Sequence, residues 1–507
     1  MKDWGIRMQR DLEFTNTPNA TRKFGIYLDG KMKSSVSGKV TTRLSPAHDC
    51  PVTEIAQADI EDVDIAVRSS RTAFDDKRWS GKSGAERASV LLKAATLIRE
   101  RQAEIAYWET LETGKPITQT NGEVAGCADM FEYASGLARS ISGESYNNLG
   151  DQLFGIVTRE PIGIVGLITP WNFPFLILCE RVPYILAAGC TIVAKPSEFT
   201  SATTLILAEI LSQAGLPNGV MNVVTGPGSV VGQALCEHKM VDMISFTGST
   251  AVGRNVICAS GQTNFKKLGL ELGGKNPQIV FADANLRDAA DGVAFGMCFN
   301  TGQCCVSGSR LLIEREVLTE FIELLKGKLN KVVIGDPLDP RTQMGSITTD
   351  AQNTTILSFI EKGMIEGAKL SFGYGKLKTK TGQFVGPVVF ENVDPSMTIY
   401  REEIFGPVLS VTPFDTLAEA ISLANDTDYG LAASVWSKDI DKILMVSRGV
   451  KAGRFWANTT LAGGPELPLG GFKQSGWGRE AGKYGIEEYT QIKSLHVASG
   501  DRDHWIE

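Results

Sequence analysis

The chain has no uninterrupted hydrophobic run long enough to span a membrane. Its most apolar stretch, Pro161–Leu178, is broken by Pro170, Asn172 and Pro174, whereas a spanning helix needs about 20 predominantly apolar residues. The first residues, Met1–Glu13, mix charges with isolated apolar side chains and lack the continuous hydrophobic region of a secretory signal. The sequence therefore predicts neither a membrane partner nor export.

The chain also lacks an excess of positive charge and a recognisable metal-binding pattern. Its formal net charge is -7, which argues against nucleic acid or an anionic membrane surface as the partner. Histidines number only four, and the nine cysteines are an odd count whose spacings match no metal site. We expect no metal, reduced thiols, a cytoplasmic location and a small-molecule ligand.

What the chain does contain is an alternation of strand-like and helical segments. A length of 507 residues predicts two or three domains. Four apolar runs are typical of strands, and each is followed by a helical pattern. Run 163–168 precedes a helical pattern that reaches 188, and run 190–194 precedes one over 201–213. Run 220–224 precedes one that begins near 230, and run 243–246 precedes one that begins at 249. Such alternation predicts an α/β fold with a parallel sheet and ligands at the carboxyl ends of its strands. Segments 317–329 and 417–425 predict helices of a second α/β domain.

Two glycine clusters follow predicted strands: Gly226-Pro-Gly228 with Gly232, and Gly248–Gly253. Glycine lets a backbone approach a phosphate closely, and a helix that begins at Ser249 would direct free N–H groups at the anion. Neither cluster has the G-x-G-x-x-G spacing, so a turn with a helix cap is an equally good interpretation.

The segment Lys195-Pro-Ser-Glu198 also follows a strand. Glu198 could accept both hydroxyl hydrogens of an adenosine ribose and would repel a 2′-phosphate, while Lys195 could bind the same ribose. A solvated turn is the alternative.

A turn with two adjacent thiols, Asn300-Thr-Gly-Gln-Cys-Cys305, is the densest candidate for chemistry. Free cysteine is commonly a small buried hydrophobe, so the pair alone favours a structural role. A nucleophilic thiol needs a base, and because no histidine motif is present, a carboxylate would have to serve. Glu271, in Glu-Leu-Gly-Gly-Lys-Asn-Pro277, is the candidate; its alternative is a surface glutamate at a strand end.

At this point the sequence resembles the aldehyde dehydrogenase superfamily over nearly its whole length. The matching segments, in order, are Leu111-Glu-Thr-Gly-Lys-Pro116, Thr169-Pro-Trp-Asn-Phe-Pro174, Lys195-Pro-Ser-Glu198, Phe246-Thr-Gly-Ser249, Glu271-Leu-Gly-Gly-Lys275, Gly302-Gln-Cys-Cys305, Glu402-Glu-Ile-Phe-Gly-Pro407 and Pro468-Leu-Gly-Gly-Phe-Lys-Gln-Ser-Gly476. Eight motifs in one order are far more specific than a single match.

The resemblance implies a catalytic set and a cofactor. It makes Cys305 rather than Cys304 the nucleophile, Glu271 the general base and Asn172 the side-chain donor to the oxyanion. It implies NAD as the cofactor, with NADP possible. The implied cofactor-binding residues are Ile168, Trp171, Lys195, Glu198, Gly228, Phe246, Gly248, Ser249, Leu272, Glu403 and Phe405.

The resemblance also implies a three-part architecture and a homodimer or homotetramer. A Rossmann-like, parallel-sheet NAD-binding domain is expected over 1–140 and 161–272, and an α/β catalytic domain over 273–474. A small β oligomerisation extension is expected over 141–160 with the C-terminal tail 475–507, which would contribute a strand across the dimer.

The aldehyde itself is less constrained. The resemblance implies a substrate tunnel lined by Phe173, Ile177, Glu180, Phe299, Cys304, Val306 and Leu469. Glu180, where many relatives carry tryptophan, and Leu469 would leave an aromatic cage for a quaternary ammonium incomplete. Glu180 could instead select an amino- or hydroxy-aldehyde, or it could simply pair with Arg181.

The resulting hypothesis is NAD-dependent oxidation of an aldehyde through a Cys305 thiohemiacetal and a thioester that Glu271 helps to hydrolyse. The alternatives are a cysteine hydrolase or acyltransferase without nicotinamide, an NADP-preferring semialdehyde dehydrogenase, and a non-catalytic relative. Transfer of the acyl group to coenzyme A is disfavoured because Glu271 is present.

Overall fold

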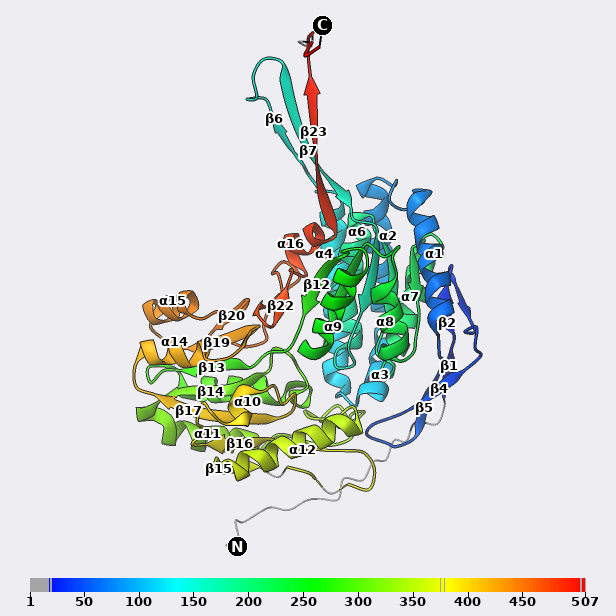
Figure 1. Ribbon diagram of the computed structural model, residues 1–507. Coiled ribbons are helices and arrows are strands. Elements are labelled where there is room, and N and C mark those ends of the chain that lie inside the picture. Colours follow the sequence, from blue (N-terminus) through cyan, green and yellow to red (C-terminus); the bar gives the residue numbers. More distant parts are fainter. Residues whose placement is uncertain (1–17, 19–20, 374, 378, 502–503, 507) are drawn as a thin grey trace.

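The computed structural model describes residues 18, 21–373, 375–377, 379–501 and 504–506, and it consists of two α/β lobes and a projecting arm (Figure 1). The prediction for Met1–Glu13 lies outside the described residues. Among the described residues, no helix is both long enough and apolar enough to cross a bilayer.

The first lobe is built on an eight-stranded sheet. Its strand order is β22 (Gly476–Trp477), β12 (Lys267–Glu271), β11 (Met243–Thr247), β8 (Ile164–Ile168), β9 (Thr191–Lys195), β10 (Met221–Val223), β2 (Ile26–Leu28) and β3 (Lys31–Lys33). The five strands from β12 to β10 pair in parallel, which confirms the predicted α/β alternation. The strands at both edges, β22, β2 and β3, pair antiparallel.

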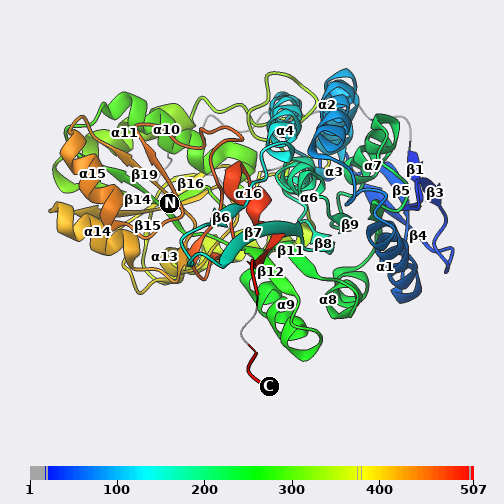
Figure 2. The same ribbon diagram turned by 90° about the horizontal axis from the view of Figure 1, so that it is seen from above.

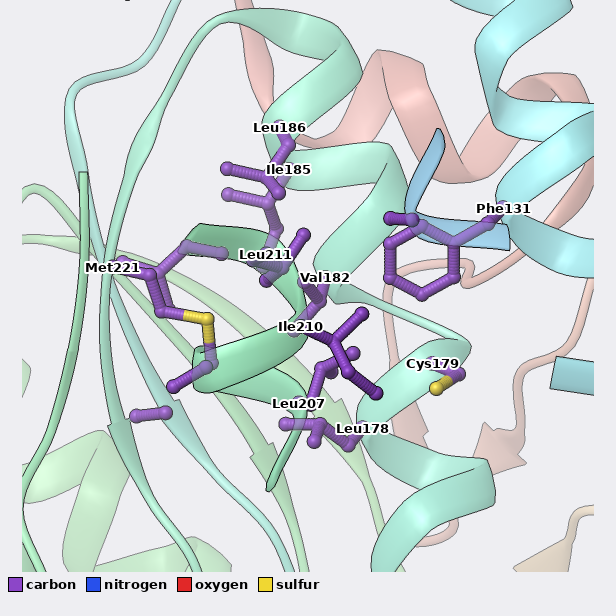
Figure 3. Packing of buried hydrophobic residues seen from close by; sticks show 14 of the residues in the cluster. Phe131, Leu178, Cys179, Val182, Ile185, Leu186, Leu207, Ile210, Leu211 and Met221 are labelled. Atoms are coloured by element: carbon purple, nitrogen blue, oxygen red, sulfur yellow. The ribbon is translucent and has the colours of Figure 1, made fainter. Parts of the chain in front are cut away.

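Helices cover both faces of this sheet, as Figure 2 shows from above. One face packs against α2 (Gly84–Glu100), α4 (Ile117–Ala138), α6 (Val182–Ala188) and α7 (Ala202–Ala214). Leucine and isoleucine side chains from α6 and α7 meet Phe131 of α4 and Met221 of the sheet there (Figure 3). The other face packs against α1 (Ile60–Asp75), α8 (Gln233–Glu237) and α9 (Thr250–Gln262). Each fully buried side chain of this kind contributes about 1.5–3 kcal/mol to folding.

Two predicted helices take a different form. The segment that was expected to run as one helix to 188 is divided into α5 (Pro174–Cys179) and α6, separated at Glu180–Arg181. Pro183 explains the second start, because proline is tolerated in the first turn of a helix but interrupts its interior. The helix expected from Val230 begins as a π-helical turn over Gly228–Gly232 and continues as α8.

The second lobe contains a seven-stranded sheet. Its order is β15 (Lys369–Gly373), β16 (Val388–Glu391), β17 (Val408–Phe414), β14 (Gly308–Glu314), β13 (Asn276–Val280), β19 (Ala432–Trp436) and β20 (Arg454–Ala457). Its helices are α10 (Leu286–Cys298), α11 (Leu318–Leu329), α12 (Asp350–Ile365), α13 (Thr398–Arg401), α14 (Leu417–Asn425) and α15 (Ile440–Gly449). The predicted helix 417–425 is confirmed as α14.

The arm is a three-stranded antiparallel sheet that extends away from both lobes (Figure 1). It consists of β6 (Glu144–Tyr146), β7 (Leu153–Pro161) and β23 (Thr490–Ala498). Nine residues of β23 pair with β7 of the same chain. Ile492, Leu495 and Val497 on β23 are exposed, so the arm presents apolar side chains that this chain does not cover.

The remaining elements connect or border the lobes. They are β1 (Arg22–Phe24), β4 (Val40–Leu44), β5 (Pro51–Ala56), α3 (Gln102–Thr113), β18 (Tyr429–Gly430), β21 (Phe472–Lys473) and α16 (Gly482–Glu488).

Candidate active site

The two thiols follow a strained turn directly after α10. Asn300, Thr301 and Gly302 all have positive φ, at 48°, 54° and 71°. A Cβ atom on Gly302 would lie 2.2 Å from the backbone carbon of Gly406, so only glycine fits there. Non-glycine residues in this conformation cost energy and are held by their surroundings. The turn places Cys304 in the protein interior and leaves Cys305 half-buried.

Asn172 lies against this turn from the loop that follows β8. Its Nδ2 donates a hydrogen bond to the carbonyl of Gln303 at 3.0 Å. The side chain of Asn300 donates to the carbonyls of both Asn172 and Gln303 at 3.0 Å, which ties the two loops together. An amide nitrogen carries two hydrogens, so Asn172 keeps one for a ligand beside Cys305.

Glu271 ends β12 and has a buried carboxyl group. Its Oε1 accepts no hydrogen bond from the described residues. Burial raises its pKa to about 8; Arg181 opposes this increase, while Glu480 and Glu180 add to it. A carboxyl that is buried, unpartnered and able to exchange a proton near neutral pH differs from a surface glutamate, and it is suited to acid–base chemistry.

The surroundings of the Cys305 thiol favour its protonated form. A hydrogen bond with Cys304 and burial raise its pKa well above the ordinary value, and the carboxylates of Glu403 and Glu180 add to the increase. Gly274 lies against the same residue, because a Cβ there would be 2.6 Å from the Cys305 carbonyl oxygen. Gly274 is three residues from Glu271, so the segment that carries the candidate base packs directly against the nucleophile.

A second group of predicted residues meets at the carboxyl end of β9. Glu198 Oε2 accepts a hydrogen bond from the Gly228 N–H at 3.2 Å and lies 3.6 Å from Lys195 Nζ. A Cβ on Gly228 would have no neighbour closer than Lys195 Nζ at 3.9 Å. The space beside Gly228 is therefore open, while its N–H already donates to Glu198, so the side chains of Glu198 and Lys195 are the groups that a hydroxylated ligand can engage.

Strand β11, which is separated from β9 by β8, ends at the second glycine cluster. Ser249 caps α9, because its side chain accepts a hydrogen bond from the Val252 N–H at 3.3 Å. A Cβ on Gly248 would lie 2.5 Å from the Phe246 ring, so this glycine is required for packing. Ile168 and Leu272 belong to the same hydrophobic cluster as Phe246, so they contribute apolar packing rather than polar contacts.

Glu403 and Phe405 of the second lobe contact the segments that carry Glu271 and Asn172. Glu403 Oε1 accepts a hydrogen bond from the Gly274 N–H at 3.0 Å, and burial raises its pKa to about 7. Phe405 has a φ of 56° and packs edge-on against Trp171 with 5.4 Å between ring centroids. The structure thus brings two widely separated predicted motifs, 169–174 and 402–407, into contact.

A cavity of about 1020 Å³ opens next to Cys298 and Phe299, which precede the thiols and line it; Cys304 and Cys305 are not among its lining residues. Of the predicted tunnel residues, Glu180, Phe299 and Leu469 line it. Phe173, Ile177 and Cys304 form a buried cluster behind it, with Phe299 and Val306 packed against them. Glu180 lies 3.6 Å from Arg181, so the predicted pairing and the predicted exposure to the tunnel are both present.

Sequence reasoning missed several charged residues of this region. Arg454 of β20 lines the cavity. Lys275 is buried with no hydrogen-bond partner among the described residues, and burial lowers its pKa to about 7. Arg181 and Glu480 form a buried ion pair at 3.3 Å. Lys275 is the last residue of the motif Glu271-Leu-Gly-Gly-Lys275, and the sequence suggests Arg181 only as a partner for Glu180, so these two carry a signal in the sequence, whereas Arg454 and Glu480 carry none.

Comparison with known proteins gives one result. The sequence profile of the aldehyde dehydrogenase family matches residues 33–495. Aldehyde dehydrogenase family 2 member C4 of Arabidopsis thaliana is 41% identical over 471 residues, which are 93% of this chain and 94% of that protein. The crystal structure of an NAD-dependent aldehyde dehydrogenase from Sinorhizobium meliloti is 48% identical, with a TM-score of 0.94 and 96% of both chains covered. A betaine aldehyde dehydrogenase from Staphylococcus aureus, solved in complex with NAD+, is 35% identical, with a TM-score of 0.93 over 95% of this chain and 97% of that one.

Proposed function

The chain belongs to the aldehyde dehydrogenase family, and from this premise we propose that Cys305, Asn172 and Glu271 carry out its NAD-dependent oxidation of an aldehyde to a carboxylic acid. The observation that supports these roles most strongly is the buried carboxyl of Glu271, whose Oε1 has no hydrogen-bond partner among the described residues. Leaving such a group unpaired costs about 1–3 kcal/mol, which a structural role does not explain.

In the first step the sulfur of Cys305 adds to the aldehyde carbon. The thiol first passes its proton to solvent water, a loss that the hydrogen bond with Cys304 and burial oppose because they raise the pKa of the thiol. Negative charge then develops on the carbonyl oxygen. The free hydrogen of the Asn172 amide and the backbone N–H of Cys305 are the proposed donors to that oxygen, each worth about 3–4 kcal/mol in comparable sites.

Bound NAD supplies the hydride acceptor that converts the thiohemiacetal carbon to the oxidation level of a thioester. The residues fit this cofactor. Lys195 and Glu198 offer hydrogen bonds to a ribose, and the missing side chain of Gly228 leaves room for it. The capped start of α9 at Ser249 presents N–H groups to a phosphate. Glu403 places its carboxyl group close enough to Cys305 to affect the pKa of that thiol.

In the last step Glu271 takes a proton from water, and the resulting hydroxide attacks the thioester carbon. The carbon–sulfur bond breaks, the carboxylic acid leaves, and the Cys305 sulfur regains a proton. A base whose pKa lies near the working pH is effective in both directions of proton transfer, which the pKa of about 8 provides.

Paired thiol variants test these roles. Cys305→Ala should abolish NADH formation from any aldehyde, whereas Cys304→Ala should retain it, because only the half-buried thiol is placed to react. Activity in Cys305→Ala equal to the unmodified enzyme would remove the assignment. A cysteine hydrolase without nicotinamide predicts instead no change in absorbance at 340 nm.

We also propose preference for NAD over NADP, because the Glu198 carboxylate is held beside Gly228 and would repel a 2′-phosphate. A homodimer or homotetramer is proposed from the exposed apolar residues Ile492, Leu495 and Val497 on the arm. Removing residues 490–507 should lower the mass of the oligomer, measured by light scattering, toward that of a single chain. The nine free cysteines support the proposed cytoplasmic location.

A further inference from the structure

Two side chains of opposite charge line the cavity, and Phe299, which also lines it, packs against the buried cluster that contains Cys304. Glu180 and Arg454 both line it. Both charges also act on the thiols: a hydrogen bond with Cys304 and burial raise the pKa of Cys305, and Glu180 adds to this increase. Burial lowers the pKa of Arg454, whereas Glu180, Cys304 and Cys305 raise it. A substrate whose aldehyde reaches Cys305 therefore lies within the field of both charges.

Arg454 has unused hydrogen-bonding capacity. Its Nη2 donates to the carbonyl of Ala462 at 3.3 Å, and its guanidinium lies 4.9 Å from the ring centre of Trp456. No carboxylate of the described residues lies within ion-pairing distance of it. Its Nε and Nη1 have no protein acceptor among those residues. The guanidinium is thus held in place by one side while its other donors remain free.

Glu180 is also incompletely paired. It lies 3.6 Å from Arg181 Nη1, beyond hydrogen-bond distance. The Arg181 guanidinium is occupied elsewhere, since it donates to Ile177, Ser245 and Thr247 at 2.6–3.2 Å. The carboxyl of Glu180 accordingly remains available to a ligand in the cavity.

Other charges on the cavity wall are neutralised by protein partners. The pairs are Glu123 with Lys115, Asp129 with Arg99, Asp291 with Lys328, and Arg341 with Asp339. Lys331 at the rim is exposed to solvent. Arg454 is therefore the cation of the cavity that is both partly buried and without a carboxylate partner among the described residues.

We infer that the preferred substrate is a small aldehyde that also carries a carboxylate, bound by Arg454, with Glu180 accepting a hydrogen bond from an amino or hydroxyl group next to that carboxylate. This inference rests on the proposed function of Cys305. A guanidinium binds a carboxylate through two parallel hydrogen bonds, and a site built for such bonds discriminates against an analogue that lacks them. An aldehyde that carries only an ammonium group is disfavoured, because Arg454 would repel it while Arg181 offsets part of the charge of Glu180.

A chain-matched set of aldehydes tests the inference: 4-oxobutanoate, its neutral methyl ester, butanal and 3-aminopropanal, each followed by NADH absorbance. The unmodified enzyme should show the highest kcat/KM for 4-oxobutanoate. Arg454→Gln should lower that value by about 10- to 100-fold, the usual effect of losing a charged hydrogen bond, mainly through KM. In the same variant, kcat/KM for the ester and for butanal should stay within about twofold of the values of the unmodified enzyme. Arg454→Lys should recover part of the loss for 4-oxobutanoate.

The control variant is Arg448→Gln, which removes an exposed arginine of α15 outside the cavity and should change none of the four values. A measurement on the unmodified enzyme avoids any effect on folding: butanedioate should inhibit butanal oxidation competitively and more strongly than butanoate. Equal inhibition by the two acids would contradict the inference.

The inference is overturned if the unmodified enzyme prefers the ester or 3-aminopropanal, or if Arg454→Gln lowers kcat/KM for all four substrates equally. The latter result would mean that Arg454 acts on the thiol or on the fold. Cys305-dependent oxidation of butanal without a preference for 4-oxobutanoate would leave the proposed function intact. Oxidation that persists in Cys305→Ala would refute the proposed function instead.

Discussion

Raising the pH should accelerate thioester hydrolysis through the ionisation of Glu271. Burial raises the pKa of this carboxyl to about 8, and only its ionised form can take a proton from water. At pH 7 about 9% of the carboxyls are ionised and at pH 9 about 91%, so the hydrolysis rate should rise about tenfold between these values.

The assay must separate hydrolysis from the formation of the thioester, because the Cys305 thiol also titrates, at higher pH. The burst of NADH reports acylation, and the following steady state reports hydrolysis. Glu271→Gln should lose the steady state and its pH dependence while keeping the burst. A hydrolysis rate in the unmodified enzyme that has already reached its plateau at pH 6 and stays constant at higher pH would refute the reasoning, since the carboxyl would then have an ordinary pKa.

Thermal stability provides an independent check on the same group. The folded pKa of Glu271, about 8, lies above the ordinary value of 4.5. The folded state therefore binds this proton more tightly than the unfolded state, and the associated stabilisation is complete below pH 4.5 and is lost as the pH rises through 8. Glu271→Gln should raise Tm relative to the unmodified enzyme more at pH 9 than at pH 5.

Three further predictions concern residues around this centre. Asn172→Ala should lower kcat by about 100- to 1000-fold in burst and steady-state assays, because it removes an oxyanion donor; a loss below tenfold would contradict that role. Lys115→Met should destabilise the fold by about 3–5 kcal/mol in urea titrations, because it leaves the buried carboxyls of Glu109 and Glu123 without their cation, which now lies 2.9 and 2.5 Å away. Glu198→Gln should raise the ratio of kcat/KM for NADP to that for NAD by about tenfold or more, because it removes the charge that repels the 2′-phosphate; an unchanged ratio would mean that selectivity lies elsewhere.

Much of the first lobe could be predicted from sequence because its strands are buried on both faces. Short apolar runs such as 190–194 predict such strands directly, and β9 is observed at Thr191–Lys195. The break between α5 and α6 was harder to predict, since apolar residues continue through it and only Glu180, Arg181 and Pro183 mark the new start. Local pattern does not tell whether a buried apolar run is one helix or two.

The candidate site divides in the same way. Cys305, Asn172 and Glu271 could be selected because each lies in a specific motif. Arg454 could not be, since it lies in an ordinary strand, β20, and acquires its position only where that strand meets the cavity. Likewise, Lys275 has no hydrogen-bond partner among the described residues, a property of its three-dimensional surroundings that no local spacing specifies.

The most direct test of the central claim is to trap the intermediate on the enzyme. Glu271→Gln should be mixed with NAD and an aldehyde, quenched in acid, digested and mapped by mass spectrometry. The account predicts one NADH per active site and an acyl group on Cys305, with Cys304 unmodified. An acyl group on another residue, or NADH formation with no acylated cysteine, would contradict it.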